Sequence, residues 1–84
     1  MSVRLTLLIR AYCHLCDDMR TALAEHVPDV AVLEVDVDAD PALEARWGAQ
    51  VPVLLAEGHE VCRYRLDTGA LDAILARSAG ANSL

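Results

Sequence analysis

The hydrophobic period changes abruptly between the first two segments of the chain, and this change constrains the fold more than any other feature. Apolar residues alternate with others over residues 3–9, which is the two-residue period of a β-strand with one buried face. Leu15, Met19 and Leu23 then recur at helical spacing, which predicts an amphipathic helix over residues 16–26. A strand that leads directly into a helix, in a chain of 84 residues, predicts one small α/β domain.

The later segments continue the alternation of strands and helices. The predicted elements are a strand (residues 30–37), a short helix (42–47) capped by Asp40-Pro41, two strands (53–56 and 61–64) joined by a tight turn, and a last helix after the cap at Asp67 and Thr68. This β-α-β-α-β-β-α order predicts a mixed four-stranded sheet flanked by three helices, with the apolar first strand in its interior. We expect residues 1–78 to form this single domain and residues 79–84 to be a frayed tail.

The charge balance excludes several classes of partner. The chain has seven basic residues, all arginine, against thirteen acidic ones, and its net charge is −6. Phosphate surfaces would repel such a protein, so we expect neither nucleic-acid nor anionic-membrane binding. No apolar run approaches the ~18–20 residues of a membrane span, and we see no secretory signal at the start. We therefore expect a monomeric, cytoplasmic protein.

A pair of cysteines lies where the first strand gives way to the first helix. Cys13 and Cys16 form a C-x-x-C motif, which beside a βαβ pattern is typical of a redox-active dithiol. The free N–H groups and partial positive charge of a helix N-terminus stabilise a thiolate at Cys13. Cys16 lies one helical turn further on and can attack a mixed disulfide formed on Cys13. We expect Cys13 to attack the substrate and Cys16 to resolve the intermediate.

Charged neighbours act on this thiolate in opposite directions. Arg10, and His14 if it is protonated, add positive potential near Cys13. Asp17 and Asp18 follow the motif directly and disfavour a neighbouring thiolate. The sequence therefore predicts that Cys13 is less acidic, and the pair more reducing, than in strongly oxidising dithiol proteins.

Metal binding is the main alternative for a C-x-x-C motif. A closed zinc site needs four ligands, and the only plausible additions are Cys62, His59 and His14. We predict no metal site within one chain, although an iron–sulfur cluster shared between two chains stays open. Cys62 falls in a predicted strand, where a cysteine is typically a small buried hydrophobe.

A proline completes a family resemblance. Val51-Pro52 stands at the start of the third predicted strand, where a residue without an N–H is tolerated. Together with the C-x-x-C motif, the Gly58 hairpin and the helix at Asp67, it makes residues 3–77 resemble the thioredoxin-fold glutaredoxins. The similarity is closer still to the short glutaredoxin-like domains. The resemblance implies a thioredoxin-like fold with a cis Val51–Pro52 bond that faces the cysteine pair.

The resemblance also implies roles for individual residues. The Val51 backbone would be the edge for an incoming cysteine-containing peptide or for glutathione, and Arg10 would meet a glutathione carboxylate. Asp67 matches the acidic residue near the last helix, and His14 lies between the two thiols. One departure is that Arg63-Tyr64-Arg65 stands where glutaredoxins usually carry a Gly-Gly pair, and bulky side chains there crowd a glutathione site.

These observations predict a thiol–disulfide oxidoreductase that reduces protein disulfides or glutathione mixed disulfides through Cys13 and Cys16. We expect no tightly bound cofactor; glutathione is a possible co-substrate, and glutathione or a thioredoxin-type donor would regenerate the dithiol. The first alternative is a non-catalytic thioredoxin-like adaptor that keeps the cysteines as a redox-sensitive contact. The second is an iron–sulfur or metal carrier.

Overall fold

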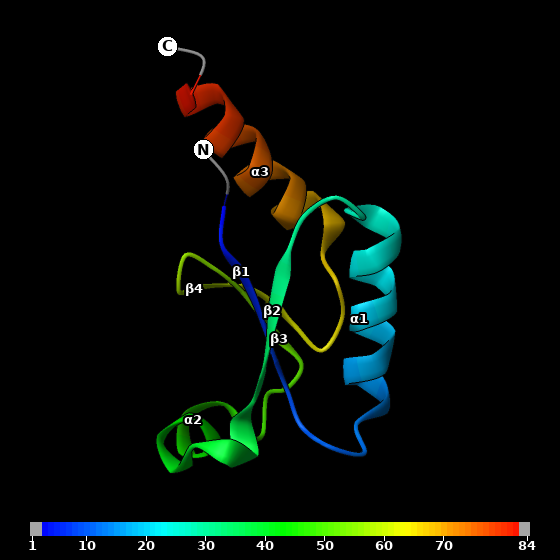
Figure 1. Cartoon of the computed structure of the whole chain (residues 1–84), viewed down its shortest axis with the longest axis vertical. Helices are drawn as coiled ribbons and strands as arrows, with labels where there is room; N and C mark the ends of the chain where they lie inside the picture. The colour runs from blue at the N-terminus through cyan, green and yellow to red at the C-terminus, as the bar shows by residue number, and fades with distance from the viewer. Residues whose placement is uncertain (1–2, 83–84) are drawn as a thin grey trace.

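The elements of the protein follow the predicted order (Figure 1). The computed structural model describes the backbone of residues 3–82 and the side chains of residues 3–77. In chain order the elements are β1 (Leu5–Ile9), α1 (His14–His26), β2 (Val32–Asp36), the 3-10 turn η1 (Val37–Ala39), α2 (Pro41–Trp47), β3 (Val53–Ala56), β4 (His59–Arg63) and α3 (Thr68–Asn82).

The four strands form one mixed sheet in the order β2-β1-β3-β4. β1 runs parallel to β2 and antiparallel to β3, and β3 and β4 form an antiparallel hairpin. β1 is therefore an interior strand, as its apolar sequence predicts. Leu5, Leu7 and Leu8 are all at most 2% exposed, which places side chains of this strand in the core on both faces of the sheet.

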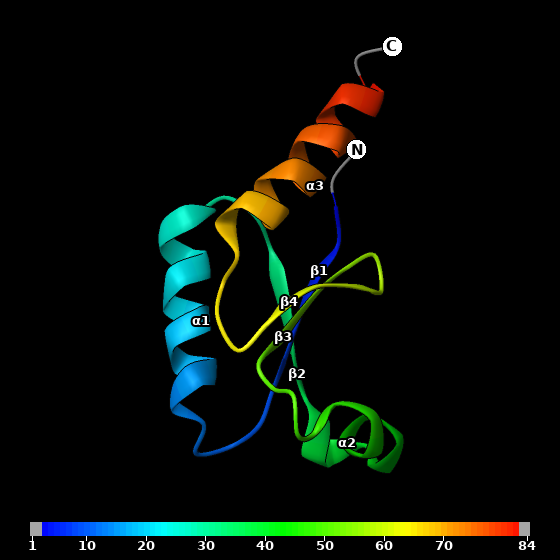
Figure 2. The ribbon, with the colours of Figure 1, turned by 180° about the vertical axis from the view of Figure 1, so that it is seen from behind.

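Helices cover both faces of the sheet, with α1 and α2 on opposite sides of the strands (Figures 1 and 2). On one face Leu7 and Leu54 pack with Met19 and Leu23 of α1 and with Leu71 of α3. On the other face a second cluster lies beneath η1 and α2; its buried members are Leu8, Cys16, Val37, Val51 and Val53. The second cluster contains one of the paired cysteines, so the core directly supports the site.

Several predicted boundaries differ from the observed ones by one or two residues. The second strand ends at Asp36 because the Asp36 side chain accepts the Asp38 N–H at 2.9 Å and begins the turn η1. The last helix, α3, extends to Asn82, and the frayed tail expected over residues 79–84 stays a prediction. Residues 83 and 84 lie outside the part of the chain that the structure describes.

The helices also bear on membrane insertion. Among residues 3–82, no helix combines the length and the apolar composition that a membrane crossing requires.

Candidate dithiol site

Cys13 caps the N-terminus of α1. Its backbone is extended, and its Sγ accepts the Cys16 N–H at 3.1 Å, a bond that satisfies one of the free donors of the helix. This cap starts the helix at His14, two residues before the predicted boundary. Cys13 is half-buried, whereas Cys16 is 1% exposed. Cys13 is thus partly exposed and Cys16 is shielded, an arrangement compatible with the predicted roles of attacking and resolving thiols.

The two cysteines form a disulfide in this structure. Their Cα atoms are 5.2 Å apart, within the range that a disulfide spans without backbone movement. The first turn of α1 therefore has the geometry that a disulfide between these two residues requires.

The proline loop faces the same part of the core. The Val51–Pro52 peptide bond is cis, as the family resemblance implies. Val51 is buried in the cluster that contains Cys16, and Cys13 packs against that cluster. The Pro52 carbonyl accepts the Tyr64 N–H at 2.8 Å, which ties the end of the β3–β4 hairpin to this loop. The structure thus brings Cys13, Cys16, Val51 and Pro52 together.

Arg10 joins the loop before Cys13 to two distant segments. Its guanidinium donates to both carboxylate oxygens of Asp38, at 2.6 and 3.3 Å, and to the Gly48 carbonyl at 2.9 Å. The hydrogen bond from Arg10 is the main reason that the pKa of Asp38 is lowered, and the same bond raises the pKa of Arg10. Gly48 ends α2 and precedes the proline loop at Val51-Pro52. Arg10 therefore connects the loop before Cys13 to the segment that leads into the proline loop. The predicted role of Arg10 in binding a glutathione carboxylate stays a prediction. In that role the Arg10 guanidinium would have to release the Asp38 carboxylate and bind the carboxylate of glutathione instead.

His14 and Asp67 occupy different surroundings. His14 is the exposed first residue of α1, directly beside Cys13. Asp67 precedes α3, where its Oδ1 accepts the Ala70 N–H at 3.0 Å and its carbonyl accepts the Leu71 N–H at 3.1 Å. Asp67 therefore caps α3, and neither of these bonds reaches the cysteine pair. The substrate-binding roles of both residues stay predictions.

Cys62 is separate from the dithiol. It lies half-buried on β4, where it packs against the core cluster beneath α1 and α3. Burial is the main cause that raises the pKa of its thiol, which leaves it less reactive than an exposed cysteine. Within residues 3–82, no group of three or more His, Cys, Asp or Glu side chains is placed to hold a metal ion.

Two tyrosines beside the dithiol have a backbone conformation that no sequence pattern indicates. Tyr12 has φ 58° and Tyr64 has φ 68°, both in the left-handed region that residues with large side chains rarely adopt. Tyr12 directly precedes Cys13, and Tyr64 is bonded to Pro52. The only sequence signal for Tyr12 is its position next to the motif.

Comparison with known proteins assigns the chain to a family. Residues 4–76 match the family model described as the glutaredoxin-like domain (DUF836), which is nearly the whole chain. The chain belongs to this family. The predicted resemblance is thereby confirmed at the level of the family.

Several solved structures are similar to the chain. The crystal structure of protein XcR50 from X. campestris is 40% identical to this glutaredoxin-like domain, with a TM-score of 0.70 and coverage of 87% of this chain and 96% of that one. Protein Ne2328 from Nitrosomonas europaea is 29% identical, with a TM-score of 0.80 and coverage of 89% and 93%. Thioredoxin 1 from Thermosipho africanus is 17% identical, with a TM-score of 0.60 and coverage of 90% and 98%. This last likeness concerns the fold alone, and the fold is thioredoxin-like, as predicted.

Proposed function

We propose that this glutaredoxin-like domain is a thiol–disulfide oxidoreductase that reduces protein disulfides or glutathione mixed disulfides. The observation that carries the proposal is the asymmetry of the cysteine pair. Cys13 is accessible and its sulfur accepts an N–H at the N-terminus of α1, while Cys16 is buried one turn further on. Such a helix terminus stabilises a thiolate at the first position and keeps the second thiol for the intramolecular step.

The proposed reaction balances without an organic cofactor. The Cys13 thiolate attacks one sulfur of the target disulfide, whose S–S bond breaks as the other target sulfur leaves and takes up a proton from solvent. Cys16 then loses its proton and attacks Cys13 Sγ, which forms the Cys13–Cys16 disulfide and releases the second target thiolate. Two electrons pass from the dithiol to the target, and glutathione or a thioredoxin-type donor returns them. Such a cycle suits a reducing compartment, and we place it in the cytoplasm.

The substrate would lie against the proline loop. In the part of the chain that the structure describes, the Val51 backbone makes no hydrogen bond to another backbone group. Val51 is 9% exposed, and in this proposal its N–H and C=O groups pair with an extended segment that carries the target cysteine. In this proposal Arg10 holds the loops on the two sides of the cysteine pair at a fixed spacing.

A trapping experiment tests the proposal. The Cys16→Ser variant should accumulate a mixed disulfide with a disulfide-bonded partner, because Cys13 still attacks but nothing resolves the intermediate. The Cys13→Ser variant is the matched control, and it should accumulate none, since the remaining thiol of the pair is buried. Equal trapping by both variants would overturn the assignment of Cys13 as the nucleophile.

An adaptor that uses the cysteines as a redox-sensitive contact is the second candidate function. The exposed carboxylates of Asp17 and Asp18 favour it, since they oppose a reactive thiolate. The reduction potential of the Cys13–Cys16 pair distinguishes the two functions. A potential near that of the cytosolic thiol pool supports catalysis, whereas a pair that does not exchange with that pool supports the adaptor.

A further inference from the structure

The guanidinium of Arg10 is held by a carboxylate of the protein itself. Arg10 is the arginine closest in the chain to Cys13, three residues before it. Its Nε and Nη2 atoms donate to the two carboxylate oxygens of Asp38, and its Nη1 donates to the Gly48 carbonyl. Arginine recognises carboxylates through two parallel hydrogen bonds of this kind. Asp38 therefore occupies an edge of Arg10 through which an arginine binds the carboxylate of a ligand.

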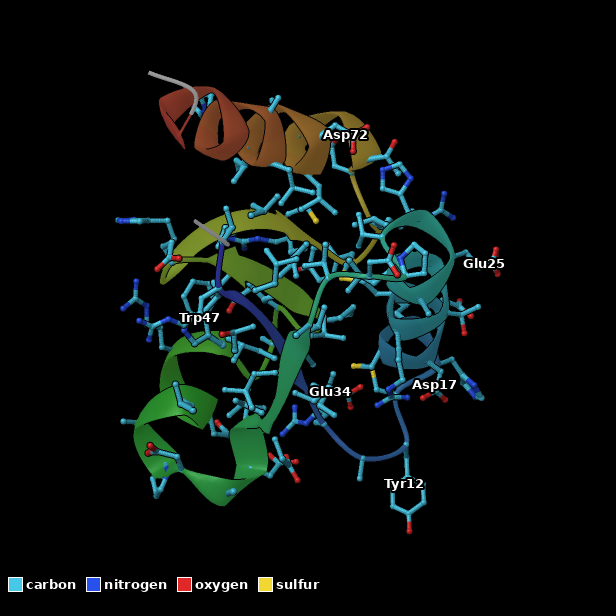
Figure 3. All side chains as sticks on the ribbon, turned by 45° about the horizontal axis from the view of Figure 1, so that its top comes forward. Tyr12, Asp17, Glu25, Glu34, Trp47 and Asp72 are labelled. Atoms are coloured by element: carbon cyan, nitrogen blue, oxygen red, sulfur yellow. A yellow bond between two sulfur atoms is a disulfide. The ribbon has the colours of Figure 1, made fainter. Side chains whose placement is uncertain are left out.

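This ion pair is built on the same part of the core as the dithiol. Arg10, Asp38 and Gly48 each directly follow a residue of the cluster beneath η1 and α2, namely Ile9, Val37 and Trp47. Cys16 is a buried member of that cluster, and Cys13 packs against it. Figure 3 shows Trp47 beside α2, on the side of the strands opposite to α1. The ion pair therefore lies next to the cluster that supports both cysteines.

The surroundings of Arg10 are acidic. Its hydrogen bond to Asp38 is the main cause that raises the pKa of Arg10, and the charges of Asp38, Glu44 and Asp36 raise it further. Arg10 in turn lowers the pKa of Asp38, so this carboxylate stays ionised near neutral pH. One cation thus faces three anions. A further carboxylate brought to Cys13 meets repulsion there, to which the net charge of −6 adds.

We propose that Asp38 is a specificity-determining residue, which withholds Arg10 from substrate carboxylates and makes the site discriminate against disulfides that carry a carboxylate near the reacting sulfur. This inference rests on the proposed function. The side chains of Arg10 and Asp38 are 36% and 44% exposed, so a substrate reaches the pair, but its carboxylate binds Arg10 only by displacing Asp38. Glutathione disulfides belong to the disfavoured class. The preferred substrates are disulfides with neutral or basic groups beside the sulfur.

Two small disulfides of different charge test the inference. The full-length protein is reduced beforehand and mixed with the pyridyl disulfide of mercaptopropionate, which carries a carboxylate, or of mercaptoethanol, which carries a hydroxyl. The Cys13 thiolate attacks the alkyl sulfur, the S–S bond breaks, and pyridine-2-thione leaves and is followed by its absorbance. The rate of the Cys13→Ser variant is subtracted to remove any reaction of Cys62. Each rate is then divided by the rate of the same disulfide with free mercaptoethanol.

The original protein alone gives the first result. We expect this normalised rate to be about threefold lower for the carboxylate disulfide than for the hydroxyl disulfide, within the range of an exposed ion pair. Equal values would overturn the inference but leave the dithiol chemistry intact. Failure of Cys13 to react with either disulfide would overturn the proposed function, and the inference with it.

Variants then assign the discrimination to the ion pair. Asp38→Asn should raise the rate of the carboxylate disulfide about fivefold, the upper end of what an exposed ion pair contributes, and leave the rate of the hydroxyl disulfide unchanged. An unchanged hydroxyl rate shows that the fold and the Cys13 thiolate are intact. Addition of Arg10→Gln to this variant should remove the gain.

Glu34→Gln is the matched control. Glu34 accepts from the Nε and Nη2 atoms of Arg20, the same two nitrogens that Arg10 uses toward Asp38, and its substitution changes the net charge equally. This variant should leave both rates unchanged. Absence of a gain in Asp38→Asn would overturn the inference, as would a gain that survives Arg10→Gln or that Glu34→Gln also produces.

Discussion

Reduction of the Cys13–Cys16 disulfide should make the protein less stable. The disulfide closes a loop between residues three positions apart, and the chain-entropy relation assigns a loop of this length about 2 kcal/mol of stabilisation at 25 °C. This contribution is lost in the dithiol form. This loss of stability is small because the loop is short. Stabilisation of the Cys13 thiolate in the dithiol form is of similar size, so it affects the difference in unfolding free energy between the two forms.

The reduced form regains part of this free energy through its thiolate. A charge at a helix N-terminus contributes about 0.3–1 kcal/mol, and the Cys16 N–H remains aimed at Cys13 Sγ. The carboxylates of Asp17 and Asp18 offset some of that gain, although Arg20 pairs with Asp17 at 2.8 Å. The difference is about 1 kcal/mol in favour of the disulfide form. By linkage, the folded pair should be about 20 mV more reducing than the same sequence in an unfolded peptide.

Urea unfolding measures this difference. Trp47 is the only tryptophan, and it packs against the cluster that contains Cys16, so its fluorescence reports unfolding. With a slope near 1 kcal/mol/M, the midpoint of the disulfide form should lie about 1 M above that of the dithiol form. The double variant Cys13→Ser/Cys16→Ser is the control, and a reductant should leave its midpoint unchanged. A dithiol form more stable than the disulfide form would refute the reasoning, because thiolate stabilisation would then outweigh loop closure.

Three further predictions concern stability. Leu71→Ala should lower the free energy of unfolding by about 2–5 kcal/mol because Leu71 is fully buried, whereas Leu33→Ala at an exposed position should change it by less than about 0.5 kcal/mol in the same urea titration. Asp67→Ala should cost about 1 kcal/mol through loss of the α3 cap, and Asp67→Asn should retain most of that stability; equal losses in thermal unfolding would rule out capping. Asp38→Asn should flatten the acid dependence of stability. Since Arg10 lowers the pKa of Asp38, the contribution of this carboxylate is complete above pH about 4 and lost as the pH falls through its folded pKa, so the variant and the original protein should converge at low pH.

Local patterns in the sequence were sufficient to predict the order of elements and the place of the cysteine pair. The two-residue period of β1 and the helical period after it locate the strand-to-helix junction, and Cys13 lies at that junction. The β3–β4 hairpin follows from a short turn between apolar runs, and Gly58 has φ 82° within it, a value that glycine adopts without strain. Each of these features depends on residues close together in the chain, which is why a pattern reveals it.

Features that depend on distant residues could not be predicted. Arg10 meets Asp38 across 28 positions and Gly48 across 38, and neither pairing leaves a local pattern. The same limit applies to Tyr12 and Tyr64, whose backbone conformations arise where the loops around the dithiol meet.

The most direct test of the central claim is the steady-state reduction of a small uncharged disulfide by the protein with a regenerating thiol donor. The account predicts that Cys13→Ser reduces the rate to that of the donor alone, because no other thiol is placed to attack. Cys62→Ser, the matched control, should keep the full rate, since Cys62 packs in the core away from the site. Full activity in the Cys13→Ser variant would contradict the account.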